Sequence, residues 1–246
     1  MKNKVLPILI FLISFLPSVR AAIQLIEFGE FGSAAISAEI PDNNLSGLAR
    51  NVNVVGHPIN APYDVTVSFK ISGIGFGAIN GDYYAYLKHF STDGSSTRLA
   101  ILLNRLGRSN ERNLGYFDNG MDVTLQDSAT HDIHSYRLAL HGSHNNPVNG
   151  ELTGIWQADG RNLDPSQVLD TSVRTTSLSQ LGVGDPNGIW TFFVADANAG
   201  GIGQLLEWKV TLQGVPEPGA VSLLTFGFVI LSALKRGAQV RKISNN

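Results

Sequence analysis

Four histidines lie close enough in the sequence to suggest a transition-metal site. Neutral imidazoles, together with the carboxylate of Asp132, have the ligand chemistry that zinc and related metals prefer. On a strand, however, residues three apart face opposite sides, so each pair needs a turn or bulge to converge. The alternative, which we favour, is a strand over residues 133–140 between polar loops. The histidines form two His-x-x-His units in HDIHSYRLALHGSH: His131 with His134, and His141 with His144.

Six aspartates in turn-like surroundings could instead supply the hard oxygen ligands that calcium prefers. None of them matches the spacing of an EF-hand loop. The alternative is turn chemistry, in which an Asp side chain accepts a hydrogen bond from a backbone amide two residues on. Calcium is therefore a hypothesis without an assigned ligand set. The six candidates are Asp82, Asp93, Asp118, Asp122, Asp127 and Asp196.

The sequence offers little support for catalysis. It contains no cysteine, which excludes disulfides, thiolate zinc sites and a cysteine nucleophile. It also lacks the Gly-x-Ser-x-Gly motif of a nucleophile elbow. Paired carboxylates for glycoside hydrolysis could be chosen in many ways, and nothing selects one pair. We therefore predict a protein that is not an enzyme.

The elements that must position these residues are short strands. In YDVTVSFKIS, the apolar residues from Val65 to Ile71 alternate with polar ones, as on a strand with one buried face. WTFFVAD predicts that Trp190 points inward, and LLEWKVTL predicts the same for Leu206 and Trp208. Turn-forming clusters such as TDGSS and SHNNPVNG separate such runs. This pattern predicts an all-β fold, a single jelly-roll-like β-sandwich.

The three tryptophans raise the possibility of a platform on which sugar rings stack. They are Trp156, Trp190 and Trp208. The last two lie on the apolar side of predicted strands, so packing in the core is the stronger interpretation for those two.

Residues 1–21 have the pattern of a signal peptide. A basic start is followed by the apolar run VLPILIFLISFLP, which is short for a membrane span, and by small residues at the recognition positions. We predict cleavage by signal peptidase after Ala21, and hence export. Residues 22–35 then form a lead-in to the sandwich, which we place at 36–213.

The C-terminal segment, 214–246, has three parts. The first is the motif Val215, Pro216, Glu217 and Pro218, in which the prolines keep Glu217 extended and accessible. Sixteen uncharged residues follow, 219–234, which as a helix would span about 24 Å, somewhat less than a ~30 Å hydrocarbon core. The basic end favours a cytoplasmic C-terminus; it contains Lys235, Arg236, Arg241 and Lys242. The alternative is a plain C-terminal anchor.

This order of parts resembles the PEP-CTERM sorting tail of Gram-negative bacteria. The resemblance implies transient insertion in the inner membrane through a transmembrane sorting helix, and removal of the tail by an exosortase-like membrane enzyme. Loss of the signal and of a tail cut before Glu217 would change the net charge from −2 to −8. A body this acidic disfavours nucleic acid as a partner.

Residues 36–213 resemble the P domain (Homo B) found beside subtilisin-like proprotein convertases. The resemblance rests chiefly on GDPNGIWTFFVADANAGGIGQLLEWKVTL, with Gly188, Trp190, Asp196 and Trp208 at the recurring positions. It implies a jelly-roll β-sandwich, and calcium in some members. No subtilisin-type catalytic domain precedes it in this sequence.

Together these patterns predict an exported, non-catalytic β-sandwich at the cell surface or in the extracellular polymeric (biofilm) matrix, with a structural or adhesive role. Extracellular polysaccharide is a candidate partner. One alternative is a glycan-binding module, which would show exposed aromatic residues on a concave sheet. Another is an accessory P-like domain that acts with a separately encoded protease.

Overall fold

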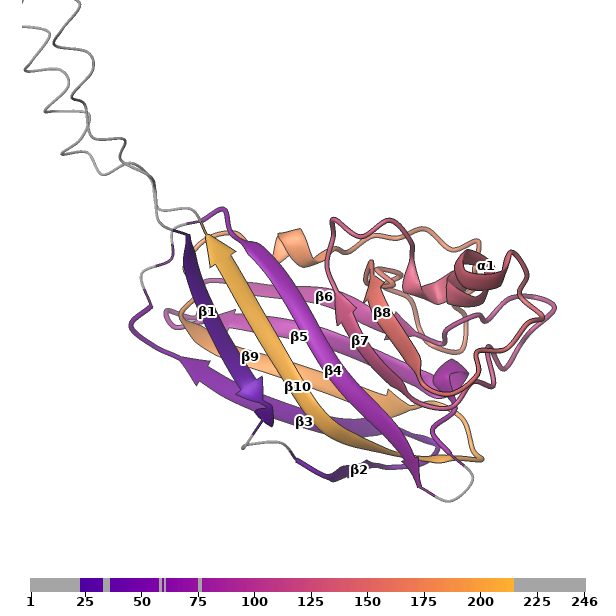
Figure 1. Ribbon diagram of the computed structural model, residues 1–246. Coiled ribbons are helices and arrows are strands. Elements are labelled where there is room, and N and C mark those ends of the chain that lie inside the picture. The colour runs from indigo at the N-terminus through magenta and orange to yellow at the C-terminus, as the bar shows by residue number, and fades with distance from the viewer. Residues whose placement is uncertain (1–22, 33–35, 58, 60, 75–76, 215–246) are drawn as a thin grey trace, which may run out of the picture. The chain divides into compact units, whose positions relative to one another are not determined.

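Two β-sheets packed face to face make up the part of the chain that the computed structural model describes (Figure 1). The described residues are 23–32, 36–57, 59, 61–74 and 77–214, and Gln24–Gly214 forms one unit. An all-β sandwich is therefore confirmed. The predicted signal peptide, the Val215–Pro218 motif, the sorting helix and the basic end lie outside the described residues. Within those residues, no helix has the length and apolar character needed to cross a membrane.

The first sheet has a central pair of long antiparallel strands, β10 and β4. Its neighbours are all antiparallel except β7 and β8, which run parallel. In spatial order the strands are β1 (Gln24–Glu30), β10 (Ile202–Gly214), β4 (Asp64–Ile74), β7 (Met121–Leu125) and β8 (Leu152–Trp156), and β2 (Ala38–Ile40) also pairs with β10.

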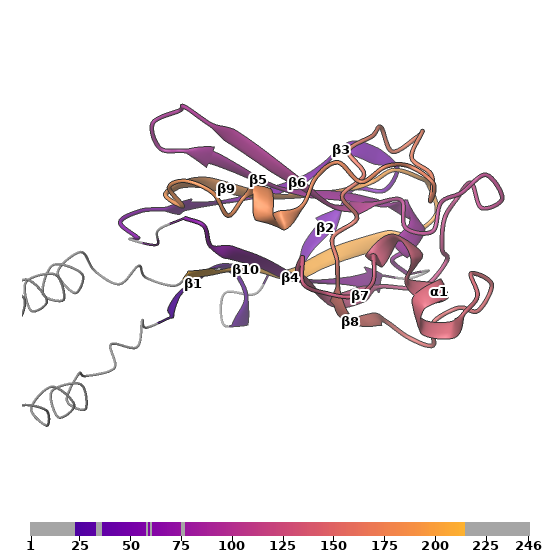
Figure 2. The same ribbon diagram turned by 90° about the horizontal axis from the view of Figure 1, so that it is seen from above.

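The second sheet is antiparallel throughout, and Figure 2 shows it as a separate layer above the first. Its strands, in spatial order, are β3 (Asn44–Val54), β9 (Gly188–Asp196), β5 (Tyr83–Ser91) and β6 (Thr97–Asn104). The short helical elements are η3 (Asn80–Asp82), η4 (Ile133–Ser135), α1 (Tyr136–His141) and η5 (Leu178–Gln180).

The alternation predicted for β4 is confirmed: Val65, Val67, Phe69 and Ile71 are buried. In β10 the prediction is correct from Trp208 onward and wrong before it. There Leu205 is buried and Leu206 is only partly buried, because a bulge between Leu205 and Glu207 shifts the register against β4. Since side chains alternate along a strand, one extra residue moves the preceding side chains to the other face.

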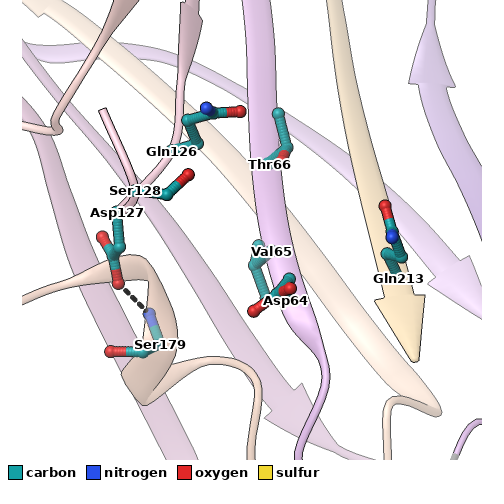
Figure 3. Close-up of a pocket in the computed structure, with 8 residues that line it drawn as sticks. All are labelled: Asp64, Val65, Thr66, Gln126, Asp127, Ser128, Ser179 and Gln213. Atoms are coloured by element: carbon teal, nitrogen blue, oxygen red, sulfur yellow. Dashed lines mark hydrogen bonds between the residues drawn. The ribbon is translucent and has the colours of Figure 1, made fainter. Parts of the chain in front are cut away.

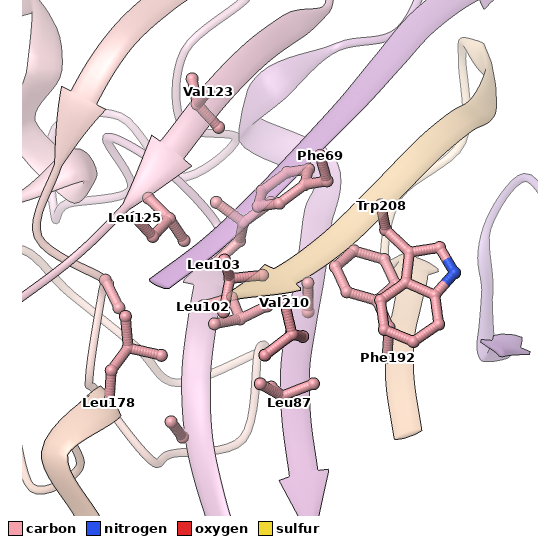
Figure 4. Packing of buried hydrophobic residues seen from close by; sticks show 14 of the residues in the cluster. Phe69, Leu87, Leu102, Leu103, Val123, Leu125, Leu178, Phe192, Trp208 and Val210 are labelled. Carbon is pink, nitrogen blue, oxygen red and sulfur yellow. The ribbon is translucent and has the colours of Figure 1, made fainter. Parts of the chain in front are cut away.

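The core lies between the sheets and is rich in aromatic side chains (Figure 4). The rings of Phe192 and Trp208 stack with centroids 5.5 Å apart, and Phe69 lies 5.4 Å from Phe192. The Trp208 indole donates a hydrogen bond to Glu30 Oε2 at 2.8 Å. This bond satisfies the polar atom of a buried aromatic residue from a strand at the edge of the sheet.

Strand β1 lies within the 22–35 segment that the sequence analysis set apart as a lead-in, so the sheet includes this segment as well. The register pairs Gln24 with Gly214. The chain therefore enters and leaves the sandwich at adjacent positions.

The strand expected over residues 133–140 is not formed. The segment is helical, as η4 and α1. Asp132 caps this turn by accepting a hydrogen bond from the His134 amide at 2.9 Å, and Gly142, with a φ of 67°, ends α1 in the left-handed conformation.

Candidate cation site at the start of β5

The histidines do not form the transition-metal site that their spacing suggested. His134 is fully buried, with Nδ1 2.7 Å from Asp159 and Nε2 3.2 Å from the Arg108 carbonyl oxygen. His144 Nδ1 pairs instead with the Tyr116 hydroxyl, and His131 and His141 are exposed. In the described part of the chain, no three His, Cys, Asp or Glu side chains are grouped so as to hold a metal ion.

Two of the six aspartates have ordinary turn or surface roles. Asp93 accepts hydrogen bonds from Ser91 and from both the amide and the hydroxyl of Ser95. These bonds lower the pKa of the Asp93 carboxyl to about 2. The exposed Asp122 forms an ion pair with Lys70 at 3.3 Å. Turn and surface chemistry therefore account for Asp93 and Asp122.

Two more aspartates hold loops in place. Asp118 is buried and accepts hydrogen bonds from both Arg137 and the Tyr136 hydroxyl. Asp127 accepts the backbone amides of Leu178 and Ser179, which caps η5. Since these carboxylates already have several donors, each has a structural role that needs no cation.

Asp127 also lines a polar hollow of about 220 Å³ (Figure 3). The remaining walls come chiefly from the start of β4 and the end of β10, including Asp64, Thr66 and Gln213. Figure 3 shows the bond from Ser179 to Asp127, which turns this carboxylate toward η5. The hollow therefore gains little free acceptor capacity from Asp127.

The remaining two candidates, Asp82 and Asp196, are brought together by strand pairing. Asp82 ends η3 directly before β5, and Asp196 ends β9. The register pairs Tyr83 with Asp196, and the Ala197 amide donates to the Asp82 carbonyl oxygen at 2.8 Å. Both side chains are only 1% exposed.

Neither oxygen of the Asp82 carboxylate has a hydrogen bond of normal geometry, although the Asn198 side chain is near enough to lower the pKa of this carboxyl slightly. Among the described residues, the one cation within ion-pair distance is the Arg105 guanidinium, which lies 3.9 Å away and donates instead to the carbonyl oxygens of Gly81 and Ala197. A buried carboxylate with both oxygens unpaired is unusual in a folded protein and indicates a missing donor or ion.

The electrostatics agree with this geometry. Burial, followed by the charge of Asp196, raises the pKa of Asp82 to about 7. Burial also raises the pKa of Asp196 to about 6, and the nearby charge of Asp42 adds to the rise. Asp42 lies in the turn before β3 and accepts the Gly200 amide at 3.2 Å. Two buried carboxylates, Asp82 and Asp196, therefore lie near one guanidinium, and the exposed Asp42 acts on them through its charge.

All free acceptors at this site are oxygens, which suits calcium better than a transition metal. Asp82 and Asp196 would be the charged ligands, with backbone carbonyls or water completing the shell. Sequence reasoning missed Asp42, which stands in the IPDNN turn ahead of β3. The only sequence feature that could have pointed to Asp42 is its position as an acid in a turn next to a strand.

No protein-family model matches the sequence, and no curated protein is significantly similar to it. The similarities to PEP-CTERM tails and to P domains therefore stay predictions.

Proposed function

We propose that this protein is an exported, non-catalytic, P-domain-like β-sandwich of jelly-roll type. Its PEP-CTERM-like tail sorts it to the cell surface or the extracellular matrix, where it has a structural or adhesive role. Calcium bound between Asp82 and Asp196 stabilises the domain there. The proposed location is based on the sequence of the two ends. The proposed calcium site is based on the side chains of the sandwich.

The observation that carries the calcium proposal is the fully buried Asp82 carboxylate with both oxygens unpaired. An unpaired carboxylate in the interior is costly unless a cation or donors compensate it. Extracellular calcium modules bind with dissociation constants of roughly 10⁻⁴–10⁻³ M, so a site of this kind fills outside the cell. A calcium requirement therefore fits an exported protein.

The pairing of Gln24 with Gly214 supports the sorting proposal. Because both ends leave the sandwich from one place, a signal and a tail can be removed without disturbing a strand in the middle of either sheet. Every strand of the two sheets lies between these residues.

The test is a thermal unfolding series on the purified protein with EDTA, calcium or magnesium. Calcium at about tenfold its dissociation constant should stabilise the fold by about 1.4 kcal/mol, since it binds the folded state alone. For a domain of this size that raises the midpoint by about 3–5 °C. Equal midpoints in EDTA and in 10 mM calcium would contradict the calcium proposal, and recovery of the protein in the cytoplasm would contradict the export proposal.

A further inference from the structure

The outer face of the second sheet carries a cluster of three aromatic side chains. Along β5, Ala85 and Leu87 are buried, so the alternating residues Tyr84 and Tyr86 point away from the core. Phe193 on β9 points the same way, because the register pairs it with Tyr86. All three are half-buried. We call Tyr84, Tyr86 and Phe193 the aromatic platform.

The rings of the platform are held in fixed positions. Tyr86 and Phe193 stack with centroids 4.6 Å apart and planes 14° apart, and Tyr84 packs edge-on against them at 6.0 and 6.3 Å. The Phe193 ring also reaches over β3 at Gly47, where a Cβ would lie 2.7 Å from Phe193 Cζ. Rigid rings lose little conformational entropy when a ligand binds.

Polar groups border the platform. A shallow hollow of about 390 Å³ lies between Tyr84 and the segment after β8, which contributes Asn162 and Asp164. On the other side, the Thr191 hydroxyl donates to Asn51 Oδ1 at 2.7 Å. The outer face thus joins apolar rings to amides, a hydroxyl and one carboxylate.

We infer that the aromatic platform and the adjoining hollow bind a neutral polysaccharide chain. A pyranose ring has an apolar C–H face that stacks on an aromatic ring, and equatorial hydroxyls that bond amides and carboxylates. The nearby charges are balanced, since Asp164 borders the hollow and Lys88 follows Tyr86 on the outer side of β5. A strongly charged polymer would be repelled by whichever of these two side chains has the same sign of charge.

This inference deepens the adhesive role proposed above and rests on it for its biological setting. It also corrects the expected position of a stacking surface. Trp156, Trp190 and Trp208 are all buried, so the tryptophans belong to the core. The tyrosines, which the sequence pattern did not single out, occupy the outer face.

The test measures retention of the purified full chain on insoluble cellulose and chitin, and its mobility in gels containing a soluble mixed-linkage β-glucan. The variants are Tyr86→Ala, Phe193→Ala and Tyr86→Phe. Loss of a central aromatic contact should weaken binding by about tenfold or more, whereas Tyr86→Phe keeps the ring and should retain most of it. Phe90→Ala is the matched control, because Phe90 is an exposed aromatic residue on the same face of β5, four residues beyond Tyr86, and has no ring contact with the platform.

Binding should be the same in EDTA and in calcium as long as the protein stays folded, because the platform and the Asp82 site are separate. A failure of the calcium proposal therefore leaves this result unchanged. The inference is overturned if a folded wild-type chain binds none of these polysaccharides, or if Tyr86→Ala binds as well as Phe90→Ala. Platform-dependent binding to phosphatidylglycerol vesicles alone would overturn it in favour of a lipid surface.

Discussion

Asp82 shows how one residue can link the fold to its surroundings. Its carboxylate lies in the interior, near a second buried acid, Asp196. The Arg105 guanidinium is 3.9 Å away. Without a bound metal ion, desolvation and the charge of Asp196 oppose the charged form more strongly than the Arg105 guanidinium favours it. The stability of the domain should therefore depend on what neutralises this one group.

Replacing Asp82 by Asn tests this dependence directly. Asn has nearly the same shape but no charge, so the metal-free variant should be more stable than the wild type at pH 8, by roughly 1–3 kcal/mol. The variant should also lose the stabilisation that calcium gives the wild type. Urea unfolding with EDTA and with 10 mM calcium measures both effects. Asp122→Asn is the control, since Asp122 is exposed and should change neither quantity. A destabilised variant that still responds to calcium would contradict the assignment.

The same carboxyls should give the metal-free protein an unusual pH dependence. Their pKa values rise on folding from an ordinary value of 3.8 to about 7 for Asp82 and about 6 for Asp196. The folded state then holds protons that the unfolded state has lost, so these groups stabilise the fold at about pH 4 and lose that contribution as the pH rises through 6 and 7. In EDTA, the thermal midpoint of the wild type should fall from pH 5 to pH 8 more steeply than that of Asp82→Asn. Parallel curves would show that Asp82 ionises normally.

At the scale of elements, β3 depends on a glycine that lets it lie close to β9. Gly47 has a φ of 53°, and a Cβ there would come within 2.5 Å of the Val194 carbonyl oxygen. Gly47 also falls between Asn44 and Leu48, where the register of β3 against β9 shifts. The irregularity of this strand is therefore built around a residue without a side chain.

Gly47→Ala should destabilise the domain by roughly 2–4 kcal/mol, because backbone strain adds to a steric clash with β9. Gly56→Ala is the matched control: its φ is 74°, but nothing lies within 4 Å of the added Cβ. It should cost only about 1 kcal/mol, from backbone strain alone. Chemical denaturation of both variants separates backbone strain from the steric clash. Equal losses in the free energy of unfolding would show that the close contact with β9 does not add to the cost at Gly47.

The elements differ in how far the sequence could predict them. The alternation of apolar and polar residues was sufficient to predict which side chains of β4 are buried, because that strand is regular and has one buried face. In β10, nothing local in LLEW marks the bulge that exchanges the roles of Leu205 and Leu206. The helix at Tyr136–His141 is too short for a clear helical period, so its only signals were the cap at Asp132 and the glycine after it.

The candidate cation site was predictable only in part for a related reason. Asp82 and Asp196 were both recognised as oxygen ligands, but their meeting depends on the pairing of β5 with β9, which are far apart in the sequence. The same applies to the platform, where Tyr86 meets Phe193 across those two strands. Neither pair can be derived from spacing, since register is a property of the assembled sheet.

At the scale of the whole molecule, the proposal separates a folded body from two removable ends. From the sequence we expect Pro216 and Pro218 to favour an extended Glu217, which a processing enzyme at the membrane would need to reach. The uncharged run after it is short and contains Ser222, Thr225 and Ser232, so it makes a weak permanent anchor.

Changing both prolines to alanine should therefore leave an uncleaved precursor in the inner membrane and reduce the amount outside the cell. The body should fold as in the wild type, because its last strand ends at Gly214. Fractionation of the native host with an internal epitope tag, followed by intact-mass measurement, detects both the location and the C-terminus. Changing Ser222 to Ala is the control, since it alters the tail without touching the motif. A wild-type protein that keeps Lys235 and Arg236 and stays in the inner membrane would contradict sorting, because the tail would then be a lasting anchor.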